Sequence, residues 1–361
     1  MRFVEITATD NYFFELLQVA LWNREKLSYT PTNEEWVSLF SEAKKQTLVG
    51  VLLPVLGRLP KEQRPPMTLL LQWVGLAKKI EQISYLHRSR GAELTQVFSA
   101  AGFRSCILKG MSTANLYPNP QSRQCGDIDL WVDGNRNDIM TFLHQKKFGI
   151  NHIYWHEVSA NIFDDVETEI HIHPAWFYNP FYNYRLQCYF EREKSKQMVG
   201  QRDGYGCVSI SFNAVYSLVH LYHHLMDEGV GMRQIVDYYY ILVHLPADER
   251  QKVVKDINWL GLSKFLASVM YVLQVACGLK LEYLLCRPND GSGFFLLKEI
   301  VAAGNFGKFD TRKHISAKEN WYQRNRRKFI RQLRFIRLYP VEVLSAPFWK
   351  LWHWTWRKVK T

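Results

Sequence analysis

Two aspartates separated by one residue are the first candidates for chemistry. Asp127 and Asp129 lie in the largely apolar run DIDLWV, which reads as a buried strand. Because side chains alternate between the faces of a strand, both carboxylates point one way, whereas Ile128 and Leu130 point into a core. Two carboxylates on one face repel each other and need a counter-charge, which a metal ion, a nearby arginine or bulk water can supply. The pair alone leaves these three possibilities open.

A second acidic pattern follows in the run ETEIHIHP. Glu167, Glu169, His171 and His173 alternate with other residues and share one predicted strand face. A neighbouring strand could therefore bring a third carboxylate beside the first two. Three carboxylates at one end of a sheet offer the hard oxygen ligands and open positions that two Mg²⁺ ions and a shared triphosphate need. The two histidines leave a zinc hydrolase as an alternative, since imidazole suits Zn²⁺ better than Mg²⁺.

A candidate phosphate-binding segment precedes the aspartates. The run ILKG ends a predicted strand at Lys109 and Gly110, and a glycine allows the backbone to approach a ligand closely. Backbone N–H groups at the start of a following helix suit phosphate. Arg123 lies four residues before Asp127 and can reach either a phosphate or the carboxylates.

Three regions with different patterns follow one another along the chain. Residues 1–100 have apolar positions three and four apart, which predict helices, with Asn33 as a candidate N-cap and Gly102 as a helix stop just beyond. Residues 101–210 contain short β-rich runs separated by loops and one helix. Residues 211–361 return to helical patterns and end in a basic, aromatic tail. The chain therefore reads as a β-containing core between two helical regions.

The runs LKG, LYPNPQSRQCGDIDLWV and EIHIHP together resemble an uncharacterised bacterial nucleotidyltransferase family within the polymerase-beta-like nucleotidyltransferase superfamily. The resemblance covers roughly residues 100–175. It implies an α+β fold, with a small mixed β-sheet core over 101–210 flanked by helical regions at 1–100 and 211–361. It implies that Asp127, Asp129 and Glu169 are the catalytic, metal-binding acids, with Glu167 as the rival for the third place.

The same resemblance implies contacts to a nucleotide. Gly110 would lie against the triphosphate, and Lys109 and Arg123 would contact phosphate. The superfamily usually has Gly-Ser at this point, whereas Met111 separates Gly110 from Ser112 in this chain. Ser112 therefore remains a candidate for phosphate binding, although the detailed geometry of the superfamily does not transfer directly.

Several histidines extend the candidate site. His171 can either bind the cofactor or hydrogen-bond to a carboxylate beside it. His220 and His224 are four residues apart, which is metal-ligand spacing on a helix, but a structural polar cluster beneath the site is the favoured interpretation. A weaker resemblance in HLYHHLMDEGVGMRQIVDYYYIL adds Arg233 and Asp237 as candidates.

The implied chemistry is nucleotidyl transfer. An NMP would pass from an NTP to an acceptor, either a small molecule or a protein, with release of pyrophosphate and with Mg²⁺, most simply two ions, at the carboxylates. The alternative is a non-catalytic module that keeps the fold and acts through its basic tail. Nothing in the sequence identifies the acceptor or the base of the nucleotide.

The positive charge of the chain is concentrated in its tail. Residues 311–361 hold fourteen Lys and Arg against Glu319 and Glu342, and this difference equals the net charge of +12 of the whole chain. Arginines interleaved with tryptophans fit nucleic acid, by phosphate contact and stacking, or an anionic membrane surface. They equally fit a terminal helix pair that packs a stripe of Phe329, Leu333, Ile336 and Leu338 onto the body, with its cations outward.

Bulk properties exclude several classes of protein. Hydrophobic residues make up 47% of the chain, so a packed core is feasible. Six scattered cysteines without a CxxC pair argue against a disulfide framework or a zinc ribbon. No run reaches the roughly 20 apolar residues of a membrane span, and acidic residues interrupt the N-terminus where a signal peptide is apolar. These features predict a cytoplasmic protein.

Overall fold

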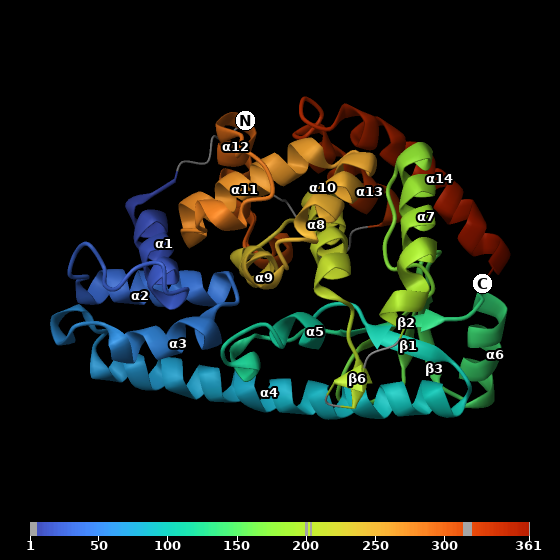
Figure 1. Cartoon of the computed structure of the whole chain (residues 1–361), viewed down its shortest axis with the longest axis horizontal. Coiled ribbons are helices and arrows are strands. Elements are labelled where there is room, and N and C mark those ends of the chain that lie inside the picture. The colour runs from blue at the N-terminus through green and yellow to red at the C-terminus, as the bar shows by residue number, and fades with distance from the viewer. Residues whose placement is uncertain (1–5, 199–200, 203, 313–319, 361) are drawn as a thin grey trace.

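The computed structural model describes residues 6–198, 201–202, 204–312 and 320–360. Its centre is a five-stranded sheet with the order β1-β2-β5-β4-β3. The strands are β1 (Arg104–Ile107), β2 (Ile128–Asp133), β3 (Gly149–Ile153), β4 (Glu157–Asn161) and β5 (Thr168–His171). β2 and β5 run parallel and the other neighbours run antiparallel, so the sheet is mixed. Helices flank it on both sides (Figure 1), which confirms the predicted α+β class.

The two faces of the sheet contribute to different cores. Ile107 and Leu130 pack with residues of helices α4 (Met67–Ala100) and α6 (Arg136–Gln145) in one core. Leu108 and Trp131 belong to the larger core of the helical body. This division follows from strand alternation, since each successive residue of β2 points to the opposite face. Trp131 stacks on Phe212 of helix α8 (Ile210–Asp227), with 5.4 Å between ring centroids. The sheet is therefore held from both sides.

The N-terminal region forms the helices predicted for it. They are α1 (Ala8–Ala20), α2 (Asn33–Lys45), α3 (Val49–Arg58) and the 34-residue α4 (Met67–Ala100). The N-cap of α2 is Thr32, not Asn33 as predicted, because the Thr32 hydroxyl accepts from the N–H of Glu35 and completes a capping box. Gly102 follows α4 with φ +85°, as a helix stop requires. α4 runs beneath both the other N-terminal helices and the sheet (Figure 1).

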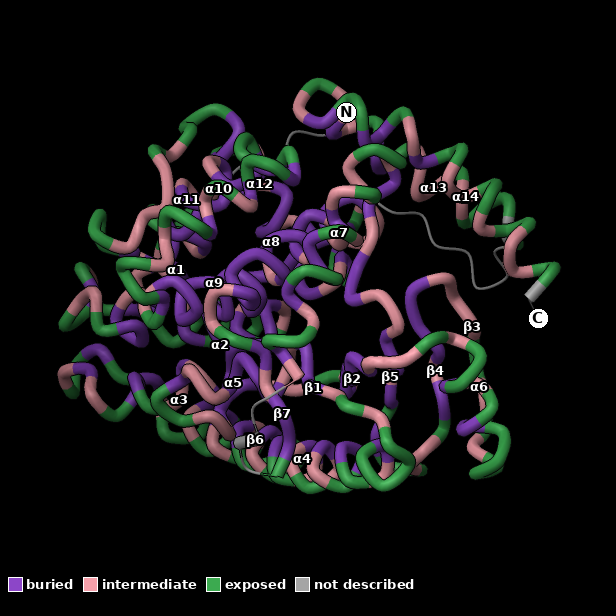
Figure 2. Tube along the Cα trace, turned by 45° about the vertical axis from the view of Figure 1, so that its right-hand side comes forward, coloured by how far each residue is buried: buried purple, intermediate pink, exposed green. Residues whose placement is uncertain are grey.

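The middle and C-terminal helices complete the body. They are α5 (Met111–Ala114), α6 (Arg136–Gln145), α7 (Pro180–Gln197), α8 (Ile210–Asp227), α9 (Met232–His244), α10 (Arg250–Trp259), α11 (Ser263–Cys277) and α12 (Asp290–Ala303). Short 3-10 turns are η1 (Lys61–Gln63), η2 (Pro120–Ser122), η3 (Leu281–Tyr283) and η4 (Asn305–Gly307), and β6 (Gln201–Arg202) pairs with β7 (Tyr205–Gly206). α8 and α9 lie in the interior and are largely buried (Figure 2). One large core unites the N- and C-terminal helices.

The tail forms a helix pair, α13 (Trp321–Leu333) and α14 (Pro340–Lys360). The predicted stripe is wrong in part: Leu333 is 41% exposed, whereas Phe335 and Tyr339, in the turn between the helices, are buried. The helix ends at Leu333, so the period of the stripe is lost there. α14 then runs along the edge of the molecule towards α6 (Figure 1), where Arg136 lies over the ring of Trp356. None of the described helices has the length and apolar character needed to cross a membrane.

Candidate active site

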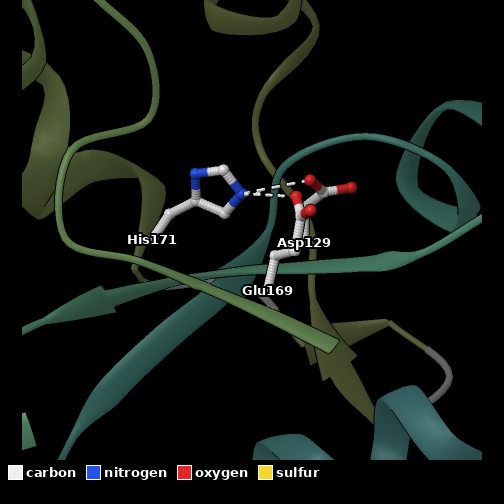
Figure 3. Close-up of side chains that lie close together, drawn as sticks. All are labelled: Asp129, Glu169 and His171. Atoms are coloured by element: carbon white, nitrogen blue, oxygen red, sulfur yellow. Dashed lines mark hydrogen bonds and ion pairs between the residues drawn. The ribbon is translucent and has the colours of Figure 1, made fainter. Parts of the chain in front are cut away.

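Strands β2 and β5 bring three predicted residues together at one end of the sheet. Asp129 and Glu169 are register partners on these parallel strands. His171 Nε2 lies 3.1 Å from Asp129 Oδ1 and 3.6 Å from Glu169 Oε2 (Figure 3). One ligand atom from each of the three residues lies within 4.8 Å of the others. The group is thus compact enough to surround a single ion.

Lys109 compensates the paired aspartates from the end of β1. Its Nζ lies 3.1 Å from Asp129 Oδ1 and 3.8 Å from Asp127 Oδ2. Burial disfavours the charged lysine, but the two carboxylates outweigh this effect and raise the pKa of Lys109 well above its usual value. Burial also acts against charge on Asp129, yet Lys109 and His171 hold the pKa of its carboxyl well below the usual range. Both aspartates therefore lie beside one fixed cation.

His171 is the second cation beside the carboxylates. Burial favours the neutral imidazole, but hydrogen bonds to Asp129 and Glu169 prevail and raise the pKa of His171 to about 10. Nε2 therefore donates to Asp129, in agreement with the simpler of its two predicted roles. Of the two histidines proposed as a zinc pair, only His171 reaches this group: His173 stacks on Trp155 and lines a different cavity. β5 ends at His171, so strand alternation no longer brings His173 to the same face.

The structure distinguishes the two candidates for the third acid. Glu169 lies in the group, whereas Glu167 is exposed and precedes β5. Glu167 also does not line the cavity of about 760 Å³ into which the group opens. Burial and the neighbouring carboxylates of Glu157 and Asp129 raise the pKa of Glu169 to about 7, against the hydrogen bond from His171 that lowers it. A carboxyl in such an environment can gain or lose a proton near neutral pH.

Glu157 is a fourth acid that the sequence reading missed. It lies on β4 opposite His171, and its Oε2 is 3.5 Å from His171 Nε2 and 3.0 Å from His156 Nε2. It lines the same cavity as the aspartates, and burial raises the pKa of its carboxyl. The run HEVSAN carries alternation that could have placed Glu157 on a strand, but only the pairing of β4 with β5 reveals its neighbours.

The donor set fits a divalent cation. Asp129 Oδ2 is buried and has no hydrogen-bond partner in the described part of the chain. Asp127 is 36% exposed at its side chain, and Glu169 is 30% exposed, so oxygens remain accessible from the cavity. Carboxylate oxygens with open positions are what Mg²⁺ requires. Asp127, Asp129 and Glu169 are the residues that could hold it.

Gly110 shapes the loop between β1 and the aspartates. Its φ of +64° and ψ of −107° are not accessible to other residues without strain, and it lies in front of α5. A side chain on Gly110 would meet the carbonyl oxygen of Asp127 at 3.7 Å. Ser112, one residue into α5, is buried and is not part of the cavity wall. The loop thus passes directly beside the aspartates.

Arg123 and Asp237 form a buried pair away from the carboxylates. Arg123 donates from Nε and Nη2 to the two oxygens of Asp237, each at 2.7 Å, and Tyr117 donates its hydroxyl to the same carboxylate. The sequence suggested that Arg123 could reach Asp127, but its guanidinium is bound to Asp237 instead. Arg233 donates to the carbonyl of Gln124 and is equally buried. These residues fasten the loop that carries the aspartates to helix α9.

A cavity of about 760 Å³ opens above the acidic group. The sheet end supplies one wall, and α8 supplies another through His220, His223 and His224. His220 Nε2 and His224 Nε2 are 3.1 Å apart, so the pair hydrogen-bonds, as the polar-cluster interpretation expected. The remaining wall comes from α13 and α14, which the sequence reading did not connect with the carboxylates.

A comparison with protein families agrees with the sequence motif around Asp127 and Asp129. The family model described as "Uncharacterised nucleotidyltransferase" matches residues 32–278. Among solved structures, the chain is similar to an antigenic nucleotidyltransferase-like protein from Paracoccidioides brasiliensis, at 15% identity and a TM-score of 0.30. That match covers 50% of this chain and 90% of the other. No curated protein matches the sequence.

Proposed function

Because the chain belongs to the family of uncharacterised nucleotidyltransferases, we propose that it transfers an NMP from an NTP to an acceptor and releases pyrophosphate. The supporting observation is the register pair of Asp129 and Glu169, with Asp127 and Lys109 beside it at the floor of a cavity. Asp127, Asp129 and Glu169 line one cavity, and the buried oxygen Oδ2 of Asp129 has no hydrogen-bond partner in the described part of the chain, as expected where a ligand completes the site. This favours an enzyme over a non-catalytic module.

Asp127, Asp129 and Glu169 are the proposed metal ligands and catalytic residues. Mg²⁺ at these oxygens, most simply two ions, supplies charge stabilisation for the phosphoryl oxygens and for the attacking hydroxyl. Glu169 is the proposed proton acceptor for the nucleophile, since its carboxylate lies in register with Asp129 and is accessible from the cavity. His171 orients Asp129 and Glu169 by hydrogen bonds instead of binding metal.

The loop after β1 is the proposed triphosphate side of the site. Lys109 Nζ lies 3.1 Å from Asp129 Oδ1 at the cavity wall, where it could also contact a phosphate oxygen. Gly110 permits close approach of a phosphate to the backbone. Arg123, Arg233 and Asp237 act by holding this loop in place, and Ser112 remains a proposed contact that depends on a shift of α5. Residues 101–210 form the proposed catalytic core.

Calorimetry with non-hydrolysable analogues of ATP, CTP, GTP and UTP tests this proposal and identifies the donor. We expect one analogue to bind only with Mg²⁺ and the double variant Asp127→Ala/Asp129→Ala to lose that binding. Glu167→Gln is the matched control, because it removes an exposed carboxylate outside the cavity. Binding without any turnover of the natural triphosphate, over a panel of acceptors, would support the non-catalytic alternative. If the double variant still bound the nucleotide, Asp127 and Asp129 would not form the nucleotide site and the proposal would fail.

A further inference from the structure

The wall of the cavity that α13 and α14 supply is lined by cations from the tail and forms its basic end. Arg324 and Lys328 of α13 line it together with Lys350, Arg357 and Lys358 of α14. The carboxylates on this side are two, Asp227 and Glu228, so five cations stand against two acids. The carboxylate end has the reverse balance, with four acids against two cations, Lys109 and His171. The cavity is therefore polarised along its length.

A row of aromatic rings connects the two ends. His171 lies beside His156, with 6.0 Å between ring centroids, and His156 packs against Trp176 at 3.8 Å. Trp176 packs against His223 at 4.0 Å, and His223 lies 5.9 Å from Tyr178. All five side chains line the cavity. Burial lowers the pKa of His156 and that of His223, the latter to about 3, so the row beyond His171 is uncharged at neutral pH. Neighbouring rings are tilted by 39–59° to one another, so they offer neutral aromatic surface between an acidic and a basic end.

The basic end is a built structure and not a set of loose surface side chains. The Tyr178 hydroxyl donates to Asp227, and Lys328 Nζ lies 3.2 Å from the other oxygen of that carboxylate. Lys350 Nζ lies 4.0 Å from Asp227 and over the ring of Tyr178. One carboxylate thus holds two ammonium groups in place. Glu228 also acts on Lys328, so these four groups balance, and the excess positive charge of this wall comes from Arg324, Arg357 and Lys358. Arg324 stands nearby in the same wall and is exposed.

We propose that this basic end binds an anionic group of the acceptor, and that a planar part of the same molecule packs against these rings, between the basic end and the carboxylates. The inference rests on the proposed function, because it assigns the acceptor half of that site. The nucleotide triphosphate belongs at the other end, beside Lys109 and Gly110. The acceptor class is a small molecule that joins a phosphate, sulfate or carboxylate to a planar body and a nucleophile.

The size and position of the cations favour a small molecule over a polymer or a membrane. A cavity of about 760 Å³ falls within the range of small-molecule sites, roughly 300–1,000 Å³. Lys328 and Lys350 face inward onto Asp227 and Tyr178, where neither a duplex nor a bilayer surface reaches them. The anionic partner suggested by the charge of the tail is thereby assigned to the interior of the cavity.

Phenyl phosphate is a suitable probe, because it carries a dianion on a planar ring. Its binding is followed by tryptophan fluorescence and calorimetry, without nucleotide or Mg²⁺. The test variant is Arg324→Gln/Lys358→Gln, which removes two exposed cations of the cavity wall. The matched control, Arg326→Gln/Arg337→Gln, removes the same charge from exposed positions of the tail that do not line the cavity. Lys328→Met serves as a second test variant if it folds, since it removes the ammonium group that pairs with Asp227.

We expect the test variant to weaken phenyl phosphate binding by about tenfold or more, the loss of roughly one charge-assisted contact. The control should bind like the wild type, and phenol should not bind. Asp127→Asn/Asp129→Asn should retain phenyl phosphate while losing the Mg²⁺-dependent nucleotide, so failure of the donor site and failure of the acceptor site are separate results. Equal binding by test and control variants overturns the inference. A second outcome also overturns it. In that outcome the wild-type protein does not bind phenyl phosphate but binds anionic vesicles or oligo(dT), and the test variant loses this binding.

Discussion

Asp129 and Glu169 face each other across the parallel pair of strands β2 and β5, in direct register. Their side chains therefore leave the sheet on the same face, and His171, two residues further along β5, donates to Asp129 and lies close to Glu169. The register fixes which of two glutamates completes the acidic group. A shift of one residue would send Glu169 to the opposite face of the sheet.

Removal of the third acid should weaken metal binding. We expect Glu169→Gln to reduce the affinity for Mn²⁺, used as a paramagnetic substitute for Mg²⁺, by about tenfold or more, because one charged oxygen ligand is lost. Electron paramagnetic resonance titration measures the free Mn²⁺ directly. Glu167→Gln is the matched control and should bind like the wild type. If the two variants behaved alike, Glu169 would not be a ligand.

Lys109 should be necessary for folding in the absence of metal. Lys109→Met leaves Asp129 buried beside fewer cations, and loss of one partner of a buried pair costs on the order of 3–5 kcal/mol. Urea unfolding measures this cost. The double variant Lys109→Met/Asp129→Asn should recover much of the stability, since no uncompensated carboxylate remains at that position. Additive losses in the double variant would mean that the two side chains are not coupled.

The pair of Arg123 and Asp237 should act on stability and not on nucleotide binding. Arg123→Met leaves the Asp237 carboxylate buried with only the Tyr117 hydroxyl, and we expect a loss on the order of 3 kcal/mol in urea unfolding. Arg123→Lys keeps a charge but not both hydrogen bonds, so its loss should be smaller. The folded Arg123→Lys protein should bind the Mg²⁺-nucleotide within about twofold of the wild type. If Arg123→Lys lost more free energy of nucleotide binding than free energy of unfolding, Arg123 would be a nucleotide-binding residue.

Glu342 should make the tail sensitive to pH. It is buried at the start of α14, where it accepts from the N–H groups of Tyr178 and Asn179, and burial raises the pKa of its carboxyl from 4.5 to about 7. Between these values the folded chain keeps a proton that the unfolded chain has released. The contribution to stability is therefore complete below pH 4.5 and is lost as the pH rises through 7.

Glu342→Gln isolates this effect, because glutamine does not titrate. The free energy of unfolding of the wild type relative to this variant should fall by roughly 3 kcal/mol from about pH 4.5 to above pH 7. Urea unfolding of both proteins at a series of pH values measures the difference. A difference that stays constant with pH would mean that the carboxyl titrates equally in both states.

The core of the candidate site could be predicted because its residues are close in sequence and follow strand alternation. Asp129 and Glu169 lie on two short runs whose apolar residues point the other way, and the observed register pairs them. Asp127 precedes β2 and lies beside Lys109. The prediction for His173 was wrong because it extended alternation beyond the last residue of β5. Alternation says nothing about where a strand ends.

The rest of the cavity depends on contacts that span most of the chain. Glu157 joins the site only through the pairing of β4 with β5. Lys328 reaches it through its pair with Asp227 of α8. Lys350 lies on α14, whose start is fixed to the segment before α7 because Glu342 accepts hydrogen bonds from the N–H groups of Tyr178 and Asn179. Arg123 was predicted to reach the nearest carboxylate in sequence, whereas its partner lies 114 residues away. Composition and spacing do not carry such information.

A crystal structure with Mn²⁺ and a non-hydrolysable nucleotide triphosphate tests the central claim most directly, because the anomalous signal of Mn²⁺ locates the ions without assumptions about the site. The account predicts anomalous peaks between the carboxylates of Asp127, Asp129 and Glu169, with the triphosphate on the side of Lys109 and Gly110. Peaks at His220 and His224 instead, or a nucleotide bound outside this cavity, would contradict it.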